Sequence, residues 1–187
     1  MAHPSREKFI PYLRGKLGDV PVSMDSEGKG IIWDCKNSWS MFNPACEFHT
    51  VIQDDAIVCE NFKERAETIL TNESKIHKNI AFNWYYGRRV ALREEAEIGL
   101  KKRYIFSNRP RWGVAICIPT RLIPEMLEFF DKLNNKQDDE RISRFLNHKK
   151  MNVYFPMPSL IDHRTEEESL VGNALSGGRK AYKFIDD

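Results

Sequence analysis

The sequence has little that would tie it to an oxidising compartment or to a membrane. It contains only four cysteines, Cys35, Cys46, Cys59 and Cys117, and no two of them have the spacing of a zinc finger or a redox motif. The N-terminus has no apolar signal segment, and no run of residues approaches the ~18 apolar residues of a membrane span. These absences favour a reduced, cytoplasmic protein with no membrane span.

The sequence also lacks a strong excess of charge of either sign. Twenty-nine Lys and Arg residues face 27 Asp and Glu residues, which leaves a net charge of +2. Bulk charge therefore does not predict a nucleic-acid-binding protein, and any site for a polyanion must be a local patch. With 187 residues, of which 41% are hydrophobic, the chain is long enough for one globular domain with a proper core.

Hydrophobic periodicity predicts alternating strands and helices in the first half of the chain and a mixed second half. The expected helices are 6–17, 31–42, 60–70, 122–133 and 139–146, and the expected strands are 20–24, 48–52, 79–86, 112–118 and 153–155. Pro11 should bend or delay the first helix. The segment 88–103 is expected to be helical or mobile. This order predicts an α/β sandwich with a mostly parallel central sheet over residues 1–172, followed by a tail at 173–187.

Two adjacent carboxylates, Asp54 and Asp55, stand directly after the strand at 48–52 and before a second apolar run. Such anions must be solvated, paired, or bound to a cation. Asp25 likewise follows a predicted strand, and ligands of open α/β sheets bind at the carboxyl ends of the strands. The pattern suits Mg²⁺ or Mn²⁺, which bind through one or two carboxylates together with phosphate oxygens. The alternative is a solvated turn without a ligand.

Two motifs in the second half extend this acidic pattern. Asp138 and Asp139 open a predicted helix, where a carboxylate would serve as a general base, as a helix N-cap, or as one of each. His163 follows a strand and the rigid Pro156-Met-Pro158 segment, so its imidazole should be held in place as a metal ligand must be.

Taken in order, these motifs resemble those of a small glycosyltransferase of the GT-A fold. The resemblance covers residues 3–172, and the compact chain is similar to virus- and phage-encoded members, some of which modify DNA bases; the host cytoplasm would then be the location. In Val51-Ile-Gln-Asp-Asp55, Gln53 replaces the first acid of the family's metal motif. The other matching segments are His3-Pro-Ser-Arg6 with Asp25, Trp112–Ile118, Asp138-Asp139 and Pro158–His163.

The resemblance implies a GT-A-like, Rossmann-type sandwich that transfers a sugar from a nucleotide diphosphate, with UDP as the expected carrier, in the presence of Mn²⁺ or Mg²⁺. Residues 1–75 would form the donor half and residues 76–172 the acceptor half. Asp55 and His163 would hold the metal, and Asp139, or Asp138 beside it, would be the catalytic base. The implied donor-binding residues are Ser5, Arg6, Asp25 and Asp54.

Aromatic and basic residues between the two halves suggest an acceptor surface for a glycan or a hydroxylated DNA base. The candidates are Trp84, Tyr85, Arg109, Arg111 and Trp112, with Lys101–Arg103, Tyr104 and Phe106 nearby. The simpler alternatives are a solvated charged face and core aromatics. Two other functions stay open, a non-catalytic nucleic-acid-binding module and a metal-dependent nuclease or phosphohydrolase. The tail, with Arg179 and Lys180, would be a lid over a diphosphate or a frayed terminus.

Overall fold

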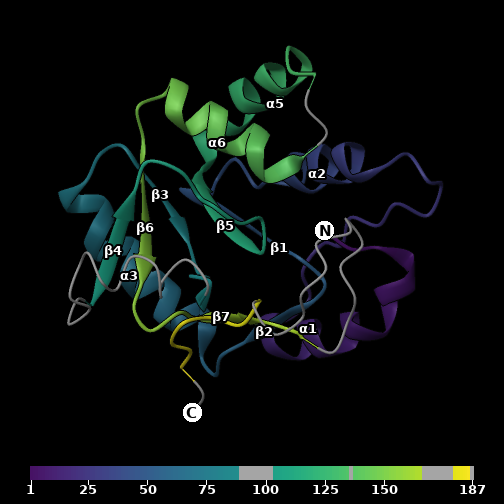
Figure 1. Cartoon of the computed structure of the whole chain (residues 1–187), viewed down its shortest axis with the longest axis horizontal. Helices are drawn as coiled ribbons and strands as arrows, with labels where there is room; N and C mark the ends of the chain where they lie inside the picture. The colour runs from purple at the N-terminus through teal and green to yellow at the C-terminus, as the bar shows by residue number, and fades with distance from the viewer. Residues whose placement is uncertain (89–102, 135–136, 166–178, 186–187) are drawn as a thin grey trace.

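The computed structural model describes residues 1–88, 103–134, 137–165 and 179–185. A five-stranded sheet with the order β1-β5-β3-β6-β4 forms its centre (Figure 1). The strands are β1 (Phe48–Ile52), β3 (Ile80–Asn83), β4 (Tyr104–Ser107), β5 (Ala115–Pro119) and β6 (Asn152–Pro156). The expectation of a mixed α/β architecture is thereby confirmed.

The sheet is mostly antiparallel, and the prediction of a mostly parallel sheet is wrong. β5 runs antiparallel to both of its neighbours, β1 and β3, and β4 runs antiparallel to β6. Only the pair β3 and β6 is parallel among the described strands. The alternation of strands and helices predicted parallel neighbours, but β5 comes from the second half of the chain and inserts, reversed, between two strands of the first half.

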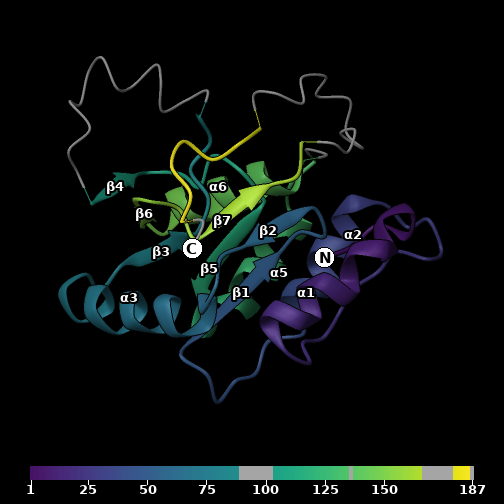
Figure 2. The same cartoon turned by 90° about the horizontal axis from the view of Figure 1, so that it is seen from below.

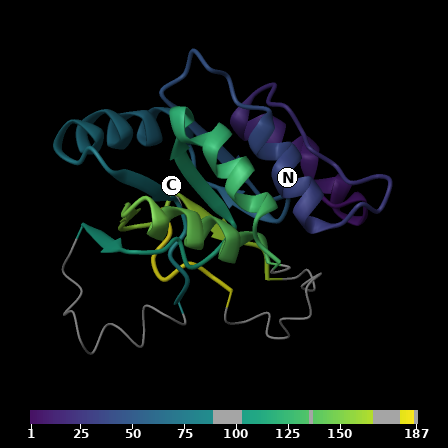
Figure 3. The same ribbon diagram turned by 90° about the horizontal axis from the view of Figure 1, so that it is seen from above.

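Helices cover both faces of this sheet (Figures 1, 2 and 3). One face carries α2 (Ile31–Ser40), α5 (Ile123–Asp131) and α6 (Asp138–His148). The other face carries α1 (Ile10–Leu17), α3 (Phe62–Ile76) and a small antiparallel sheet of β2 (Ala56–Val58) and β7 (Ile161–His163). None of the helices in the described residues has the length and the apolar character needed to cross a bilayer.

The alternating side chains of the strands divide the core into two parts. In β5, Ile116 and Ile118 pack against the layer of α2, α5 and α6, whereas Ala115 and Cys117 pack toward α1 and α3. Since both faces of the sheet are covered there, the central strand β5 is apolar and buried throughout rather than alternating. Cys35, Cys59 and Cys117 are buried free thiols, whereas Cys46 is exposed.

Several element boundaries differ from the prediction. Residues Pro4–Phe9 form a 3-10 helix, and α1 begins only at Ile10, so that Pro11 lies in its first turn, where a missing N–H costs little. Residues 20–24 form no strand but a single parallel bridge, Ala2 to Met24. A second 3-10 helix, Thr120–Leu122, precedes α5. The short strands β2, β4 and β7 were not predicted, and most of 88–103 lies outside the described residues.

One edge of the sheet gathers the segments predicted to be functional. β1, β3 and β6 run in the same direction, so their carboxyl ends meet there, together with the start of β5. The described part of the tail, 179–185, also packs here and is not frayed. The amide of Tyr182 donates to the carbonyl of Tyr86 (2.8 Å), and that of Ser159 to the carbonyl of Lys183 (2.8 Å).

Candidate functional site

The adjacent aspartates occupy a turn that leads out of the main sheet. The amide of Gln53 donates to the carbonyl of Val114 in front of β5 (2.9 Å), and the amide of Ala56 donates back to the carbonyl of Gln53 (3.2 Å). Asp54 and Asp55 are the two central residues of this turn. They are only 5% and 1% exposed, so neither is solvated and each needs a partner.

Arg6 provides the first partner. Its Nη1 lies 3.2 Å from Oδ1 of Asp54 and 2.5 Å from Oδ2 of Asp55, and its side chain is buried. The backbone amide of His3 adds a hydrogen bond of 2.7 Å to Oδ2 of Asp54. The N-terminal 3-10 helix therefore places Arg6 against Asp54 and Asp55. Arg6 is one of the residues predicted to bind the donor.

His163 reaches Asp55 through the small sheet. β2 follows the aspartate turn, and its pairing with β7 sets Ala56 opposite His163. As a result, Nε2 of His163 lies 3.3 Å from Oδ2 of Asp55, and the amide of Arg164 donates to the carbonyl of Asp55 (2.9 Å). The predicted ligand pair, Asp55 and His163, is thus brought together, although they are more than one hundred positions apart in the sequence.

The imidazole of His163 is oriented by its other nitrogen. Nδ1 donates to the carbonyl of Arg164 (2.6 Å), which leaves the Nε2 lone pair directed at Asp55 and Arg179. Burial lowers the pKa of His163, and the nearby cations Arg179 and Arg6 lower it further, while Asp55 opposes them. The ring is therefore neutral at neutral pH, which is the form that binds a metal ion.

Arg179 is the second cation of the cluster. Its Nη2 lies 3.1 Å from Oδ2 of Asp55 and donates to Nε2 of His163. The guanidinium groups of Arg6 and Arg179 thus compensate the charges of the buried carboxylates Asp54 and Asp55. Oδ1 of Asp55, however, is buried and has no hydrogen-bond partner among the described residues.

The donor set around Asp55 fits a divalent cation. It offers an unpartnered carboxylate oxygen on Asp55 and an oriented imidazole nitrogen on His163. Mg²⁺ and Mn²⁺ take few protein ligands when phosphate oxygens complete the shell. Over the described part of the chain, no group of three or more His, Cys, Asp or Glu side chains is arranged to hold a metal, so a substrate would have to supply the remaining ligands.

The second acidic pair opens α6. Gln137 is the N-cap, so Asp138 and Asp139 stand inside the first turn rather than at the cap position. Burial raises the pKa of Asp138. Burial, with the charge of Asp138 second, raises the pKa of Asp139 to about 6. A carboxyl group with a pKa near the working pH is suited to accept a proton.

Gly113 connects the two acidic pairs. A Cβ on Gly113 would lie 3.0 Å from Nε2 of Gln53, 3.3 Å from Oδ2 of Asp138 and 3.7 Å from Cβ of Asp139. The side chain of Gln53, next to Asp54, therefore lies beside Asp138 across a position that only glycine leaves open. This brings both acidic pairs to one edge of the sheet.

Asp25 and Ser5 have local roles in the structure. The carboxylate of Asp25 accepts the amides of Lys29 (2.8 Å) and Gly30 (2.5 Å), which closes the loop in front of α2. The hydroxyl of Ser5 lies 2.8 Å from Nδ1 of His3. Both side chains are on the exposed or partly exposed surface, and their predicted donor contacts stay predictions.

The predicted aromatic acceptor residues lie mainly in the core. Trp84 is 0% exposed and stacks on Phe82, and Tyr85 is buried with its hydroxyl donating to the carbonyl of Arg179. Their burial is at odds with a platform for a polymer, because a platform must be reachable from solvent. Trp112 is partly buried, with its ring edge-on to that of Tyr85.

The basic acceptor candidates lie on the connection between β4 and β5. Arg109 is exposed. Arg111 is partly buried, has a φ of 66°, and lies with its Nε 3.4 Å from the hydroxyl oxygen of Ser107. Their position next to Trp112 leaves them at the border of the candidate site, whereas Lys101 and Lys102 lie outside the described residues.

Three residues contribute to the candidate site in ways that the sequence did not predict. Gly113 carried no signal beyond its place in a strand-like run, and His3 acts through its backbone amide. Arg179 was expected only as part of a tail that forms a lid over a diphosphate or a frayed terminus, because nothing local indicates that it meets Asp55. Its 124-residue separation from Asp55 is a tertiary relationship.

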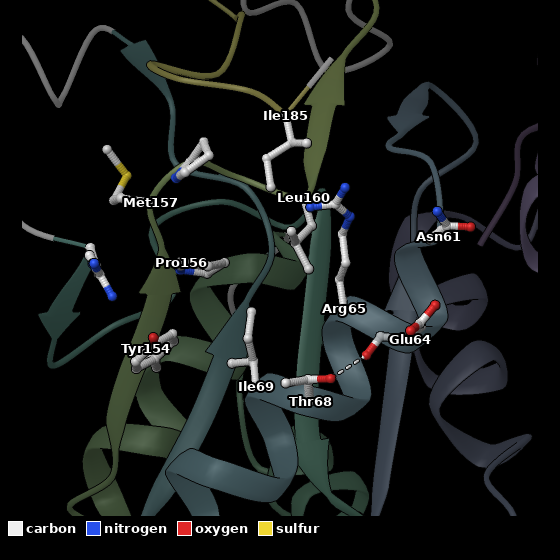
Figure 4. A pocket seen from close by; sticks show the side chains of 12 residues that line it. Asn61, Glu64, Arg65, Thr68, Ile69, Tyr154, Pro156, Met157, Leu160 and Ile185 are labelled. Atoms are coloured by element: carbon white, nitrogen blue, oxygen red, sulfur yellow. Dashed lines mark hydrogen bonds between the residues drawn. The ribbon is translucent and has the colours of Figure 1, made fainter. Parts of the chain in front are cut away.

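Two hollows lie away from the cluster of Asp54, Asp55, Arg6, Arg179 and His163. One, of about 490 Å³, is formed by α3, the end of β6 and the following loop, with Arg65, Tyr154, Leu160 and Ile185 around it (Figure 4). The other, of about 610 Å³, lies at the opposite edge of the sheet, by Cys46 and Pro119. Neither is lined by the acidic residues described above.

No protein-family model matches the chain, and no curated protein is significantly similar to it.

Proposed function

We propose that this chain is a metal-dependent glycosyltransferase with a GT-A-like fold, which moves a sugar from a nucleotide diphosphate, with UDP as the expected carrier, to an acceptor hydroxyl. The observation that carries the proposal is the meeting of two differently built acidic pairs at one edge of the sheet. Asp54 and Asp55 are compensated by cations, whereas the buried Asp138 and the partly exposed Asp139 have raised pKa values. The pair compensated by cations is suited to binding the leaving group, and the pair with raised pKa values is suited to accepting a proton.

Asp55 and His163 would hold the divalent cation, Mn²⁺ or Mg²⁺. When bound, the cation would stabilise negative charge on the nucleoside diphosphate that leaves. Asp54 is fixed by Arg6 and by the amide of His3, so that its position beside the donor is set before binding. Preorganisation of this kind removes the need to reorient charged groups during the reaction.

Asp139 would take the proton of the acceptor hydroxyl. It is partly exposed while Asp138 is buried, so Asp139 is the carboxylate that an acceptor can reach. Asp138 raises the pKa of Asp139 and lies beside Gln53 across Gly113. In this role Asp138 positions and tunes the base rather than acting on the acceptor itself.

The carboxyl ends of three strands mark the edge of the sheet at which we expect the donor to bind. β1, β3 and β6 run one way, with β5 reversed between β1 and β3, and the acidic turn follows the carboxyl end of β1. Ligand sites of layered α/β proteins gather at the carboxyl ends of such strands. The acidic turn and the later histidine then meet where a donor would bind.

Thermal unfolding with a ligand panel tests the proposal. The protein is heated with Mn²⁺ alone, with nucleoside diphosphates alone, and with both, because a ligand of the folded state raises the melting temperature. We expect a shift that needs the metal and one nucleoside diphosphate together. Asp139→Asn should keep this shift but lose sugar transfer, measured by mass spectrometry on candidate acceptors. A panel with no metal-dependent shift would contradict the proposal.

A second candidate function is a non-catalytic nucleic-acid-binding module. It is favoured by the aromatic side chains of β4, since Tyr104 is 42% exposed and Phe106 is 37% exposed, with Arg103 beside them. Exposed aromatics and arginines bind single strands by stacking and phosphate contact. Binding of single-stranded DNA that weakens with salt and ignores both metal and nucleotide sugar would favour this function. Metal-dependent cleavage of a phosphodiester would instead favour a nuclease.

A further inference from the structure

Arg179 places a cation where the proposed metal would have to bind. Its Nη2 donates both to Oδ2 of Asp55, at 3.1 Å, and to Nε2 of His163. These two acceptors are 3.3 Å apart, so one donor group satisfies both. A divalent cation held by Asp55 and His163 would therefore compete with the guanidinium of Arg179 for Nε2 of His163.

The two arginines of the cluster differ in how firmly they are held. The side chain of Arg6 is 7% exposed and bonds to Asp54 as well as Asp55. The side chain of Arg179 is 21% exposed and comes from the chain segment at the surface of the site. Of the two side chains, that of Arg179 is therefore the more exposed to solvent.

The backbone around Arg179 is anchored independently of its guanidinium. The hydroxyl of Tyr85 donates to the carbonyl of Arg179, and the next amides along the chain are also bonded. Ala181 donates to Oδ1 of Asp162 (2.5 Å), and Tyr182 donates to the carbonyl of Tyr86 (2.8 Å). The segment would therefore stay next to the site when the guanidinium of Arg179 moves away from Asp55.

The charges of the cluster give this exchange a direction. Among the described residues, the charges of Arg6 and Arg179 offset those of Asp54 and Asp55. Replacement of Arg179 by a divalent cation would make the cluster positive, with the released guanidinium beside it. Such an arrangement attracts an anion with several oxygens, and a guanidinium binds phosphate in a bidentate manner.

We propose that Arg179 is an exchangeable counter-cation: it occupies the Asp55–His163 site in the free protein, is displaced there by a divalent metal, and then binds the diphosphate of the donor. This inference rests on the proposed function, since it concerns the same site. It predicts opposite effects of removing Arg179 on the two ligands, a pattern that a purely structural arginine would not produce.

The test compares Arg179→Ala with Lys180→Ala, which removes the same charge from the neighbouring, exposed residue. Calorimetric titration with Mn²⁺ alone should show about tenfold tighter binding by Arg179→Ala than by the wild type, because the competing cation is gone. Titration with UDP at saturating Mn²⁺ should show about tenfold weaker binding by Arg179→Ala. Lys180→Ala should match the wild type in both titrations.

Two further variants separate the possible failures. Arg179→Lys keeps the charge and should bind Mn²⁺ less tightly than Arg179→Ala, and thermal unfolding shows whether each variant is folded. Asp55→Asn should lose Mn²⁺ binding. If it does, but Arg179→Ala binds Mn²⁺ no more tightly than the wild type, the exchange is refuted and the metal site remains. If the wild type itself binds no Mn²⁺, the exchange and the metal-dependent function fall together.

Discussion

At the residue scale, Asp55 is the most constrained side chain of the candidate site. It is 1% exposed, and one of its oxygens meets Arg6, Arg179 and His163. A buried carboxylate of this kind is retained at a desolvation cost, and its partners become unpaired charges when it is removed. The same carboxylate therefore carries both stability and the proposed function.

Replacement of Asp55 by alanine should destabilise the fold as well as abolish activity. The variant removes the buried carboxylate that contacts Arg6, Arg179 and His163, although Arg6 keeps its contact with Asp54. We expect a loss of about 3–5 kcal/mol in the free energy of unfolding. Urea denaturation measures this loss. Asp131→Ala is the control, because Asp131 pairs with Lys36 at the surface and its side chain is 65% exposed, so a change within about 1 kcal/mol is expected. Equal effects of the two variants would contradict the structural role of Asp55.

Asp139 should make the reaction rate fall at acidic pH. As a general base it must be ionised, so the rate should fall as the pH drops through about 6, the raised pKa of Asp139. A pH profile of turnover at saturating donor checks this. A rate that stays constant from pH 7.5 to pH 5 would exclude Asp139 as the base.

The same shift should make Asp139 destabilising at neutral pH. Its pKa rises from an ordinary value of 3.8 to about 6 on folding, so the folded state prefers the protonated form. The resulting penalty is absent below pH 3.8, grows between the two values and is complete above about 6. Asp139→Asn should therefore stabilise the protein by about 1–2 kcal/mol at pH 7.5, after allowance for solvent screening. Urea unfolding of Glu140→Gln, which removes a surface charge of the same turn, should show no such gain.

At the element scale, short segments set the geometry of the site. The turn after β1, the three-residue strands β2 and β7 and the first turn of α6 carry Asp54, Asp55, His163 and Asp139. Long elements, such as α3 and β5, provide the packed support underneath. Small shifts between the short segments should therefore affect activity more than stability.

Gly113→Ala tests this separation. The added Cβ would lie 3.0 Å from Nε2 of Gln53 and 3.3 Å from Oδ2 of Asp138, so these two side chains would each have to shift by a few tenths of an ångström. A shift of this size next to the proposed base should lower turnover about tenfold while the protein remains folded. Gly15→Ala is the matched control, since no atom lies within 4 Å of its Cβ and it sits in helix α1, where alanine adds about 0.5–1 kcal/mol. Turnover equal in both variants would argue against the role of Gly113.

At the scale of the whole molecule, segments near both ends of the described chain lie together at the carboxyl edge of the sheet. Arg6 enters from the N-terminal 3-10 helix and Arg179 from the last described segment, and both contact Asp55. Segment 179–185 also makes backbone hydrogen bonds with residues 86, 88 and 159. Segment 179–185 therefore both packs on the folded core and supplies a side chain, Arg179, to the candidate site.

Truncation after residue 178 should destabilise the protein. It removes the buried side chain of Ala181, the counter-cation Arg179 and several backbone hydrogen bonds, each worth about 0.5–1.5 kcal/mol. A loss of at least about 3 kcal/mol in the free energy of unfolding is expected from urea denaturation. An unchanged denaturation midpoint would show that the segment contributes nothing to the folded state.

The sequence by itself determined the local features of this protein. The amphipathic patterns of α5 and α6, the apolar runs of β1 and β5 and the adjacency of Asp54 and Asp55 are all encoded within a few residues. Periodic burial leaves a signal along the chain, because each face of a helix or strand recurs at a fixed spacing. These elements were found with their positions nearly correct.

Only the tertiary structure decided the direction of the strands and the partners of the carboxylates. β5 inserts between β1 and β3, the pairing of β2 with β7 delivers His163 to Asp55, and Arg179 arrives from the end of the chain. These relationships join segments that are distant in the sequence, and they arise from packing complementarity over the whole core. A single sequence carries no local pattern for such pairings, so the adjacency of Asp54 and Asp55 was visible in the sequence while their contacts with Arg6 and Arg179 were not.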